Sequence, residues 1–292
     1  MDKISVGIGE ILWDVFSHGK VLGGAPANFA YMASQFGLTG YVLSAVGDDM
    51  YGDEILQMLE EKELKFLINR TKQPTGTVQV TVDAEGIPKY NIQENVAWDN
   101  ILFTAEMENL ARKTCTVCFG SLAQRSRISR NNINRFLDFV PDDAFRIFDI
   151  NLRQHYYSFE LIDSSLQRCN VLKINDEELA VVTELFDWKN KTEIEAAKLL
   201  LVNYNLKIVI LTKGIHGSYV ITNDEVLFKY TPRIIVTDTV GAGDSFTAAF
   251  VSALLKGKSI SEAHQLAIDI SAFVCTQRGA MPLLPDNMVI NE

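Results

Sequence analysis

The chain has 292 residues, of which 47% are hydrophobic and 22% are charged, so it can bury the core of one α/β domain. Its formal net charge of −10 repels nucleic acid and anionic membrane surfaces, and we expect neither as a partner. No run of about 18 apolar residues is present to cross a membrane, and we expect no signal peptide because acids interrupt the N-terminal stretch at Glu10 and Asp14.

Short apolar runs alternate with helical patterns along most of the chain. Such an alternation predicts an α/β fold, in which helices cover both faces of a parallel sheet. Ile208–Thr212 lies in an almost entirely apolar stretch, which is typical of a central strand buried on both faces. The predicted strands are Ser5–Gly9, Tyr41–Val46, Thr116–Phe119, Phe145–Ile150, Val171–Ile174, Ile208–Thr212 and a strand-like run at 233–238. The predicted helices are Ala27–Phe36, Gly52–Glu63, Arg130–Phe139, Glu193–Asn203 and Ser245–Lys256.

The segment Thr75–Ile92 breaks this alternation. Val78, Val80 and Val82 alternate with polar residues, and Asp83–Pro88 supplies a turn. This pattern predicts a β-hairpin with one apolar face. A hairpin alone is only marginally stable, so the main domain, a substrate or a second subunit must cover that face.

The stretch Thr237–Phe250 reads TDTVGAGDSFTAAF and carries the strongest chemical signal. Gly241, Ala242 and Gly243 precede a predicted helix, where free backbone N–H groups and the helix dipole can hold an anion. If that anion is a γ-phosphate, Asp244 can accept the proton of an attacking hydroxyl. By spacing alone, an ordinary tight turn with an acid in the first helical turn is an equal alternative.

This stretch resembles the C-terminal signature of the ribokinase-like (PfkB) carbohydrate kinases. VLGGAPANFAYMASQFG at 21–37 resembles their N-terminal signature, and FDINLR at 148–153, LKINDEE at 172–178, TKGIHG at 212–217 and RGAMP at 278–282 also match. The resemblance implies one ribokinase-like domain over residues 1–292. Its fold would be a three-layer sandwich with a mostly parallel central sheet and a small β-hairpin lid, formed mainly by 75–92 and the loop near 12–22. The GEILWD start and ENVAWD at 94–99 are most similar to the fructokinase branch.

The resemblance also implies a sugar site. An Asp after the first strand can accept two hydroxyl hydrogen bonds, and an Asn can both donate and accept. The plainer alternatives are a solvated loop acid for Asp14, a helix-end cap for Asn28, and for Arg153 a surface position paired with Asp149. The implied substrate-binding residues are Asp14, Gly23, Gly24, Asn28 and Arg153.

The nucleotide and metal sites are implied in the same way. Asn175 and Glu178 have the spacing of a helix N-cap and its N3 acid, whereas in the family this pair organises Mg²⁺ and phosphates through water; both interpretations stay open. Asp238 and Val240, with the loop at 278–280, resemble a loop whose backbone carbonyls hold K⁺, and two ordinary surface loops are the alternative. The implied ATP-binding residues are Thr212, Lys213, Gly214, Gly217, Gly241 and Gly243.

The function implied is ATP-dependent phosphorylation of a small sugar, fructose first, at a primary hydroxyl. Asp244 would be the base, the amides of Gly241–Gly243 would stabilise the transferring group, and ATP, Mg²⁺ and K⁺ would be the cofactors. A same-family kinase for another sugar or a nucleoside, and a non-catalytic sugar-binding regulator, remain open. Two lids that clasp each other would give a homodimer.

The four cysteines bear on the compartment. Cys115 and Cys118 form a C-x-x-C in a strand-like segment, with no second pair to complete a zinc site. We therefore expect buried structural thiols and a reducing compartment, the cytoplasm.

Overall fold

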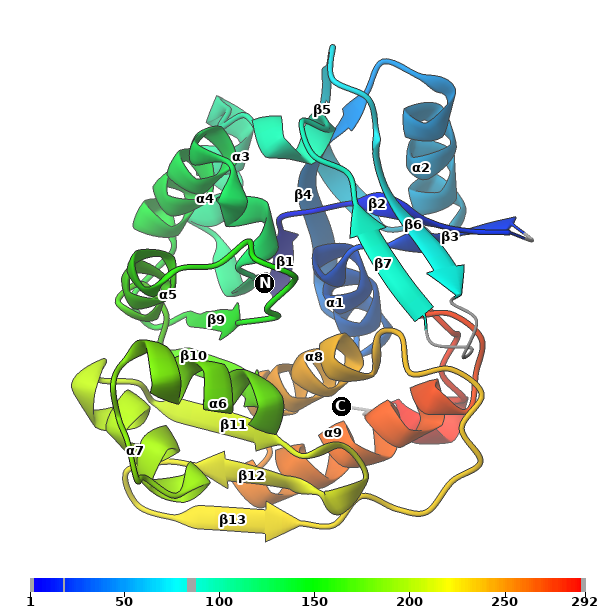
Figure 1. Ribbon diagram of the computed structural model, residues 1–292. Coiled ribbons are helices and arrows are strands. Elements are labelled where there is room, and N and C mark those ends of the chain that lie inside the picture. The colour runs from blue at the N-terminus through cyan, green and yellow to red at the C-terminus, as the bar shows by residue number, and fades with distance from the viewer. Residues whose placement is uncertain (1–2, 18, 83–87, 290–292) are drawn as a thin grey trace.

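The computed structural model describes residues 3–17, 19–82 and 88–289. Its central sheet has the strand order β13-β12-β11-β10-β9-β8-β1-β4-β5 in this part of the chain (Figure 1). All neighbours pair in parallel except β11 with β12 and β12 with β13, which are antiparallel. The strands are β1 (Ile4–Ile8), β4 (Thr39–Gly47), β5 (Lys65–Thr71), β8 (Thr114–Phe119), β9 (Phe145–Asp149), β10 (Val171–Asn175), β11 (Ile208–Thr212), β12 (Ser218–Ile221) and β13 (Val226–Lys229).

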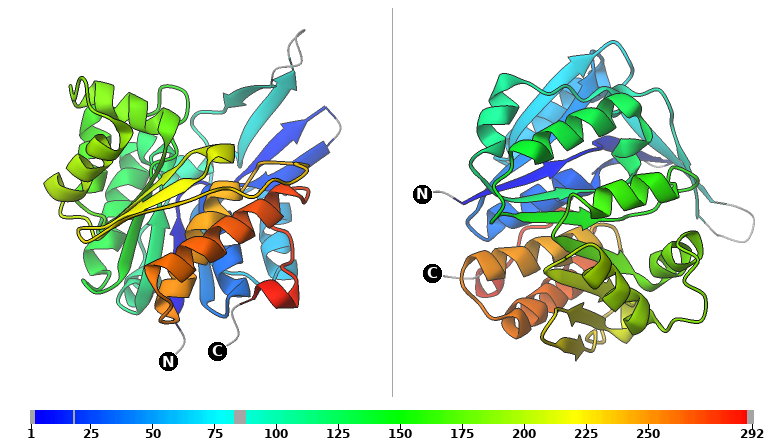
Figure 2. Two further views of the ribbon diagram at one scale, coloured as in Figure 1. Left: turned by 90° about the horizontal axis from the view of Figure 1, so that it is seen from below. Right: turned by 90° about the vertical axis from the view of Figure 1, so that its left-hand side faces the viewer.

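Helices cover both faces of this sheet, as the alternating pattern predicted (Figure 2). Strand β11 is buried on both faces, because Val209 and Leu211 pack into the core on one face of the sheet and Ile210 packs into the core on the other. This burial explains why its sequence is almost continuously apolar. One face carries α1 (Ala25–Gln35), α2 (Met50–Glu61), α8 (Ala242–Leu255) and α9 (Ile260–Cys275). The other carries α3 (Ala105–Ala111), α4 (Arg127–Phe139), α5 (Phe159–Leu166), α6 (Asp176–Leu185) and α7 (Glu193–Asn203).

Parallel pairing places polar residues together at one edge of the sheet. Asn175 at the end of β10 is in register with Thr212 at the end of β11, and Lys173 is in register with Asp149 at the end of β9. Ligands of open α/β sheets bind at this carboxyl edge.

The strand-like run at 233–238 is not a strand. It is an extended loop between β13 and α8, and the side chain of Ile235 is 90% exposed. Pro232 just before the run lacks an N–H group, and the amides of Thr237 and Asp238 donate to the carbonyl of Cys275 at the end of α9 instead of to a strand. The apolar residues of this run therefore line a cavity or face solvent, not a sheet neighbour.

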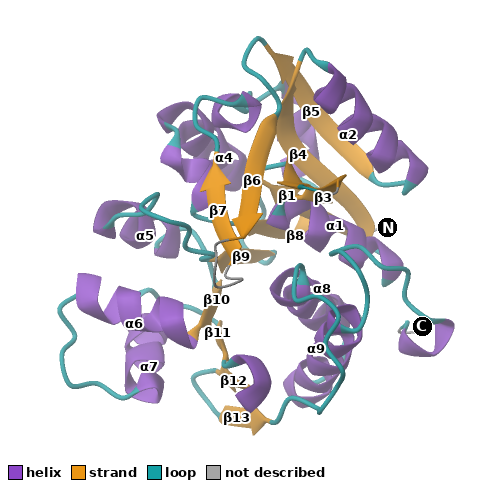
Figure 3. Cartoon of the chain, turned by 45° about the vertical axis from the view of Figure 1, so that its right-hand side comes forward, coloured by secondary structure: helices purple, strands orange, loops and turns teal. Residues whose placement is uncertain are grey.

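The lid is larger than a hairpin. Strands β2 (Leu12–Phe16), β3 (Gly19–Gly23), β6 (Gly76–Val82) and β7 (Pro88–Ile92) form a second sheet in the order β3-β2-β6-β7. The left view of Figure 2 shows this sheet projecting from the body, and Figure 3 shows its strands β6 and β7 side by side. The region near 12–22, expected as a loop, thus provides two strands. Because four paired strands bury more surface than one hairpin, the lid gains stability of its own. Most of the predicted turn, residues 83–87, lies outside the described residues.

The apolar face of the lid is covered, at least at its base, by the same chain. Val78 is 5% exposed and belongs to the core cluster that also holds Ile92 and Trp98. The side chains of Val80 and Val82 lie outside the described residues. The homodimer stays a prediction. Because the same chain already covers Val78, the apolar face of the lid supports a homodimer less than the sequence analysis suggested.

Two further expectations meet the structure here. No disulfide joins the four cysteines; Cys118 and Cys169 are buried as expected, whereas Cys115 and Cys275 are half-buried. Among the described helices, none has both the length and the apolar character that a membrane span requires.

Candidate active site

The turn Gly241–Gly243 opens helix α8. Gly241 is the N-cap residue with φ of 77°, in the left-handed region that favours glycine. A Cβ there would also come within 2.5 Å of the Cβ of Ala280. No side chain caps this helix end. The Ala242 N–H donates to the backbone oxygen of Thr239 at 3.3 Å, whereas the N–H groups of Gly243 and Asp244 have no intrahelical partner and are available to an anion.

Asp244 lies in the first turn of α8 and contacts the opposite helix α1. The amide Nδ2 of Asn28 donates to Asp244 Oδ2 at 2.8 Å. Burial and the charge of Asp149 raise the pKa of Asp244 to about 6, although the Asn28 hydrogen bond, Lys173 and Arg153 act to lower it. A carboxylate with a pKa near 6 is mostly ionised at neutral pH and can still accept a proton, as a general base must.

The implied substrate-binding residues Asp14, Gly23, Gly24, Asn28 and Arg153 come from the lid strands β2 and β3, the start of α1 and the loop after β9, and we call them the lid-side group. A Cβ on Gly23 would come within 2.5 Å of Asp14 Oδ2, so glycine leaves room for this carboxylate. Gly24 caps α1 with φ of 119° and packs against the backbone oxygen of Glu10. Burial raises the pKa of Asp14 to about 6, with Arg153 opposing the rise and Asp238 adding to it.

Arg153 is exposed, and its Nη1 donates to the backbone oxygen of Leu152 at 3.0 Å. Its charge lowers the pKa values of Asp14 and Asp244. The alternative partner considered from the sequence, Asp149, is bound to another cation.

That cation is Lys173, which the sequence reasoning missed. Its Nζ lies 3.0 Å from Asp149 Oδ1, both side chains are at least nine-tenths buried, and Thr247 donates to Asp149 Oδ2 at 3.2 Å. Burial alone would lower the pKa of Lys173, but the charges of Asp149 and Glu178 raise it. A Cβ on Gly243 would come within 2.8 Å of Nζ, so a permanent cation adjoins the glycine turn. The available signal was a charged residue inside the otherwise apolar run VLKI.

Asn175 and Glu178 form the capping box that the plainer interpretation predicted. The Asn175 N–H donates to Glu178 Oε2 at 2.9 Å, and the Glu178 N–H donates to Asn175 Oδ1 at 2.8 Å. The Leu152 N–H donates to Glu178 Oε1 at 3.1 Å. Burial raises the pKa of Glu178, opposed by Lys173. Each carboxylate oxygen keeps a lone pair for a water, so the cap does not exclude a role near a solvated ion.

A cleft of about 900 Å³ extends from this turn between the end of β11, the loop at 231–239 and α9. We call it the α8 cleft. Of the implied ATP-binding residues, Thr212, Gly214, Gly217 and Gly243 line it, whereas Gly241 is not among its lining residues. Lys213 does not line it either: its ammonium pairs with Glu193. The lining also includes Lys173, Asn175, Ile215, Ile234, Val236, Thr239, Ala242, Gly243, Phe246, Ile268, Ala272 and Cys275.

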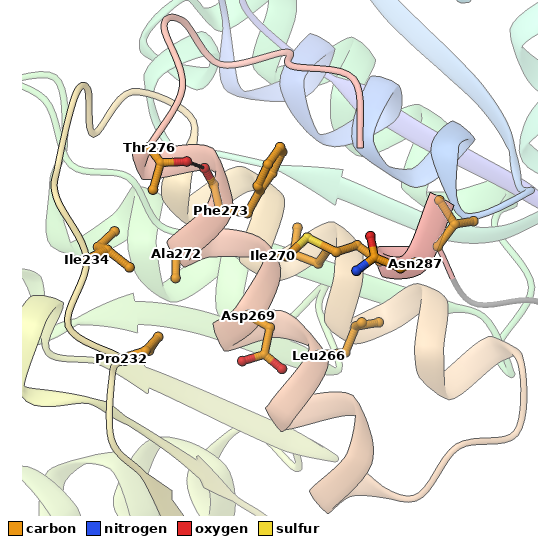
Figure 4. A pocket seen from close by; sticks show the side chains of 11 residues that line it. Pro232, Ile234, Leu266, Asp269, Ile270, Ala272, Phe273, Thr276 and Asn287 are labelled. Carbon is orange, nitrogen blue, oxygen red and sulfur yellow. Dashed lines mark hydrogen bonds between the residues drawn. The ribbon is translucent and has the colours of Figure 1, made fainter. Parts of the chain in front are cut away.

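A smaller hollow of about 580 Å³ lies on the other side of the same loop (Figure 4). It shares Pro232, Ile234 and Ala272 with the α8 cleft, and its remaining lining is apolar apart from Asp269, Thr276 and Asn287. It has neither a glycine turn nor a cation among its lining residues. Of these two cavities in the described part of the chain, the α8 cleft is the one with phosphate-binding chemistry.

The two loops proposed to hold a monovalent cation lie side by side. Asp238 Oδ1 accepts from the Val240 N–H at 3.1 Å, and Asp238 Oδ2 accepts from the Gly279 N–H at 3.1 Å. Asp238 thus ties both loops together behind the glycine turn, and the backbone carbonyls remain available as ligands.

Comparison with known proteins bears on this arrangement. A family model described as pfkB family carbohydrate kinase matches residues 6–287. The chain belongs to this family. It is thus a carbohydrate kinase, and the family assignment made from the two signatures is confirmed.

Relatives within the pfkB family span nearly the whole chain. An ATP-dependent 6-phosphofructokinase of Thermoanaerobacterium thermosaccharolyticum is 26% identical, covering 96% of this chain and 90% of its own. A probable fructokinase-2 of Arabidopsis thaliana is 27% identical, covering 91% and 84%. Among solved structures, the fructokinase of Xylella fastidiosa with bound ATP superposes with a TM-score of 0.85 at 20% identity, covering 98% of this chain and 96% of its own. A putative ribokinase II of E. coli gives a TM-score of 0.82 at 20% identity, covering 96% and 95%, so the ribokinase-like fold is confirmed.

Proposed function

We propose that this carbohydrate kinase transfers the γ-phosphoryl group of ATP to a primary hydroxyl of a neutral sugar, with fructose as the preferred acceptor. The observation that carries the proposal is the position of Asp244. It sits at the glycine turn of the α8 cleft and is hydrogen-bonded to Asn28 of the lid-side group. A carboxylate between an anion site and a polyol site can accept the hydroxyl proton as the phosphoryl group leaves the nucleotide.

The residues around Asp244 have complementary tasks. The first-turn amides of α8 and the ammonium of Lys173 face charge that develops on the transferring phosphoryl oxygens. The lid-side group orients the sugar through Asp14 and Asn28, and closure of the lid sheet over it excludes water as a competing acceptor.

Mg²⁺ fits the donors at the end of β10. Magnesium prefers oxygen ligands and keeps several waters, so Asn175 and Glu178 would hold it through water, and when bound it neutralises charge on the phosphate oxygens. The E. coli ribokinase II structure with ATP and Mg²⁺ supports this choice.

K⁺ fits the carbonyls of the loops that Asp238 joins, including those of Asp238 and Val240. The fructokinase of Vibrio cholerae was solved with fructose, ADP and a potassium ion, which supports both the ion and the sugar. Since Asp14 and Asn28 suit any polyol, the preference for fructose rests on the fructokinases among the relatives.

A screen of coupled ADP release tests the proposal. Fructose, ribose, glucose, adenosine and fructose 6-phosphate are compared with Mg²⁺ and K⁺ present. We expect kcat/KM for fructose to be at least about tenfold above the other acceptors, a preference of about 1.4 kcal/mol. If another sugar or a nucleoside gives a higher kcat/KM, the assignment of fructose is wrong, whereas the kinase assignment stands. If no acceptor stimulates ADP release, a sugar-binding regulator becomes the better account.

A further inference from the structure

Three buried polar atoms near the lid-side group have no hydrogen-bond partner among the described residues. They are Glu10 Oε2, Asn28 Oδ1 and Arg125 Nη1. Glu10 and Asn28 are each 4% exposed, and the side chain of Arg125 is 7% exposed. Burial without a partner costs free energy, most of all for charged groups. Groups left in this state together point to a ligand that pairs with them.

Arg125 is held rigidly by its other contacts. Its Nε and Nη2 each lie 2.9 Å from a carboxylate oxygen of Asp99. Its guanidinium stacks 3.9 Å from the ring centre of Trp98 and 4.7 Å from that of Tyr156. The remaining nitrogen, Nη1, is therefore a donor whose direction is already set.

Glu10 is a buried carboxyl that follows the first strand and feels the charges of both Arg125 and Asp244. Its backbone oxygen packs against Gly24, and the adjacent Gly9 packs against Ala123, two residues before Arg125. Within the described residues no salt bridge neutralises it. Burial raises the pKa of Glu10 to about 7, with Arg153 and Arg125 opposing the rise and Asp244 adding to it. The carboxyl is thus within electrostatic reach of both the lid-side group and Arg125.

We infer that Glu10 is a sugar-selecting residue, which hydrogen-bonds hydroxyls of a neutral polyol together with Asn28 and Arg125 and disfavours sugars that carry a phosphate or carboxylate there. The inference rests on the proposed function and names its substrate class. Hydroxyl groups supply what the three atoms lack, because each can donate to Glu10 or Asn28 and accept from Arg125.

A sugar that carries a negative charge would be repelled at the same place. A phosphate at this place would face the carboxylates of Glu10, Asp14 and Asp244, while the charge of Arg125 is already matched by Asp99. Arg153 lowers the pKa values of Glu10 and Asp14, and it has no carboxylate salt bridge among the described residues. Selection against phosphorylated sugars is then an electrostatic consequence of the acids.

Binding and turnover of fructose and fructose 6-phosphate, measured on the full chain, test the inference. Glu10→Gln keeps the shape and removes the charge, and Glu10→Ala removes both. We expect Glu10→Ala to raise KM for fructose about ten- to a hundredfold with KM for ATP unchanged, and Glu10→Gln to recover part of that loss. Both variants should improve the ratio of fructose 6-phosphate to fructose turnover at least about tenfold. Glu195→Gln, which alters an exposed capping box on α7, is the control. It should change neither KM for fructose nor the ratio of fructose 6-phosphate to fructose turnover.

The outcomes separate this inference from the proposed function. Lower thermal stability of both Glu10 variants with unchanged sugar KM and unchanged selectivity would show a structural role only and overturn it. A wild-type protein that binds fructose 6-phosphate more tightly than any neutral sugar would also overturn it, while the kinase assignment stands. If another neutral sugar proves to be the acceptor, the same changes in KM and in selectivity are expected for that sugar in place of fructose.

Discussion

The α8 cleft and the lid-side group differ in their charged side chains and in the kind of ligand that these side chains suit. At the cleft, Lys173 is neutralised by Asp149, and the anion site consists of glycine backbone. At the lid, Asp14 is half-buried and Glu10 is buried, neither has a salt bridge among the described residues, and their pKa values rise to about 6 and about 7. The cleft is therefore prepared for phosphate at any ordinary pH, whereas the lid side changes its charge within the physiological range.

The largest effect should come from the residue shared by both regions. Asp244→Asn keeps the size of the side chain but cannot accept a proton near neutral pH, so kcat should fall about 10²–10⁴-fold with ATP affinity nearly unchanged. Steady-state ADP release and calorimetric ATP binding measure the two quantities. A variant that keeps more than about a tenth of the rate would remove Asp244 from the role of general base.

The paired charges of the cleft should control stability. Lys173→Met leaves Asp149 buried without its cation. We therefore expect the free energy of unfolding, measured in denaturant, to fall by about 3–5 kcal/mol. Combining it with Asp149→Asn should return part of that loss, since the buried charge is then gone as well. A loss below about 1 kcal/mol for the single variant would mean that Asp149 is compensated by other groups.

The lid side should control sugar affinity alone. Asp14→Ala removes a carboxylate that can bind two neighbouring hydroxyls, so KM for the sugar should rise about ten- to a hundredfold while ATP affinity changes little. Titration of ATP and sugar into the same variant separates the two. Equal losses of both affinities would show that the cleft and the lid group do not act independently.

Activity and stability should respond to pH in opposite directions. Asp244, with a pKa of about 6, cannot accept a proton once it is protonated, so the rate at saturating sugar and pH 5 should be about a tenth of that at pH 7.5. Protonation of Asp14, whose pKa is also about 6, should raise KM for the sugar over the same range. Folded-state pKa values raised above the unfolded values mean that the folded chain binds more protons, so the free energy of unfolding should fall as pH rises from 5 to 7. Glu10, with a pKa of about 7, adds to this trend.

The two pH profiles can be checked by initial rates and by thermal melts in matched buffers. Asp244→Asn should flatten part of the slope in the melting temperature. A melting temperature that rises across this range would contradict the raised pKa values.

The smallest effect should come from the loops that Asp238 joins. If their carbonyls hold K⁺ behind the glycine turn, then K⁺ should raise kcat several-fold over Na⁺ or a large organic cation at matched ionic strength, with sugar KM unchanged. Equal rates in all three salts would show that the loops hold the turn without an ion.

Local pattern determined much of this protein. The apolar runs predicted six parallel strands of the central sheet within a few residues, and the glycines of GAGD predicted the start of α8, because side-chain periodicity and positive φ are properties of a short segment. The family resemblance, through the GEILWD start and the two signatures, predicted that Asp14, Asn28 and Asp244 belong to one site. The lid hairpin was predicted by alternation, but not the second pair of strands in its sheet.

What the tertiary structure decided involves residues far apart in the chain. The contact between Asn28 and Asp244 joins positions separated by 216 residues, and the pairing of Lys173 with Asp149 needs two neighbouring strands and burial on both faces. The raised pKa of Glu10 arises from its surroundings, not from its sequence neighbours. The run at 233–238 is apolar enough for a strand but has no strand to pair with. Burial and partner atoms set these properties, and both are defined only once distant elements pack together.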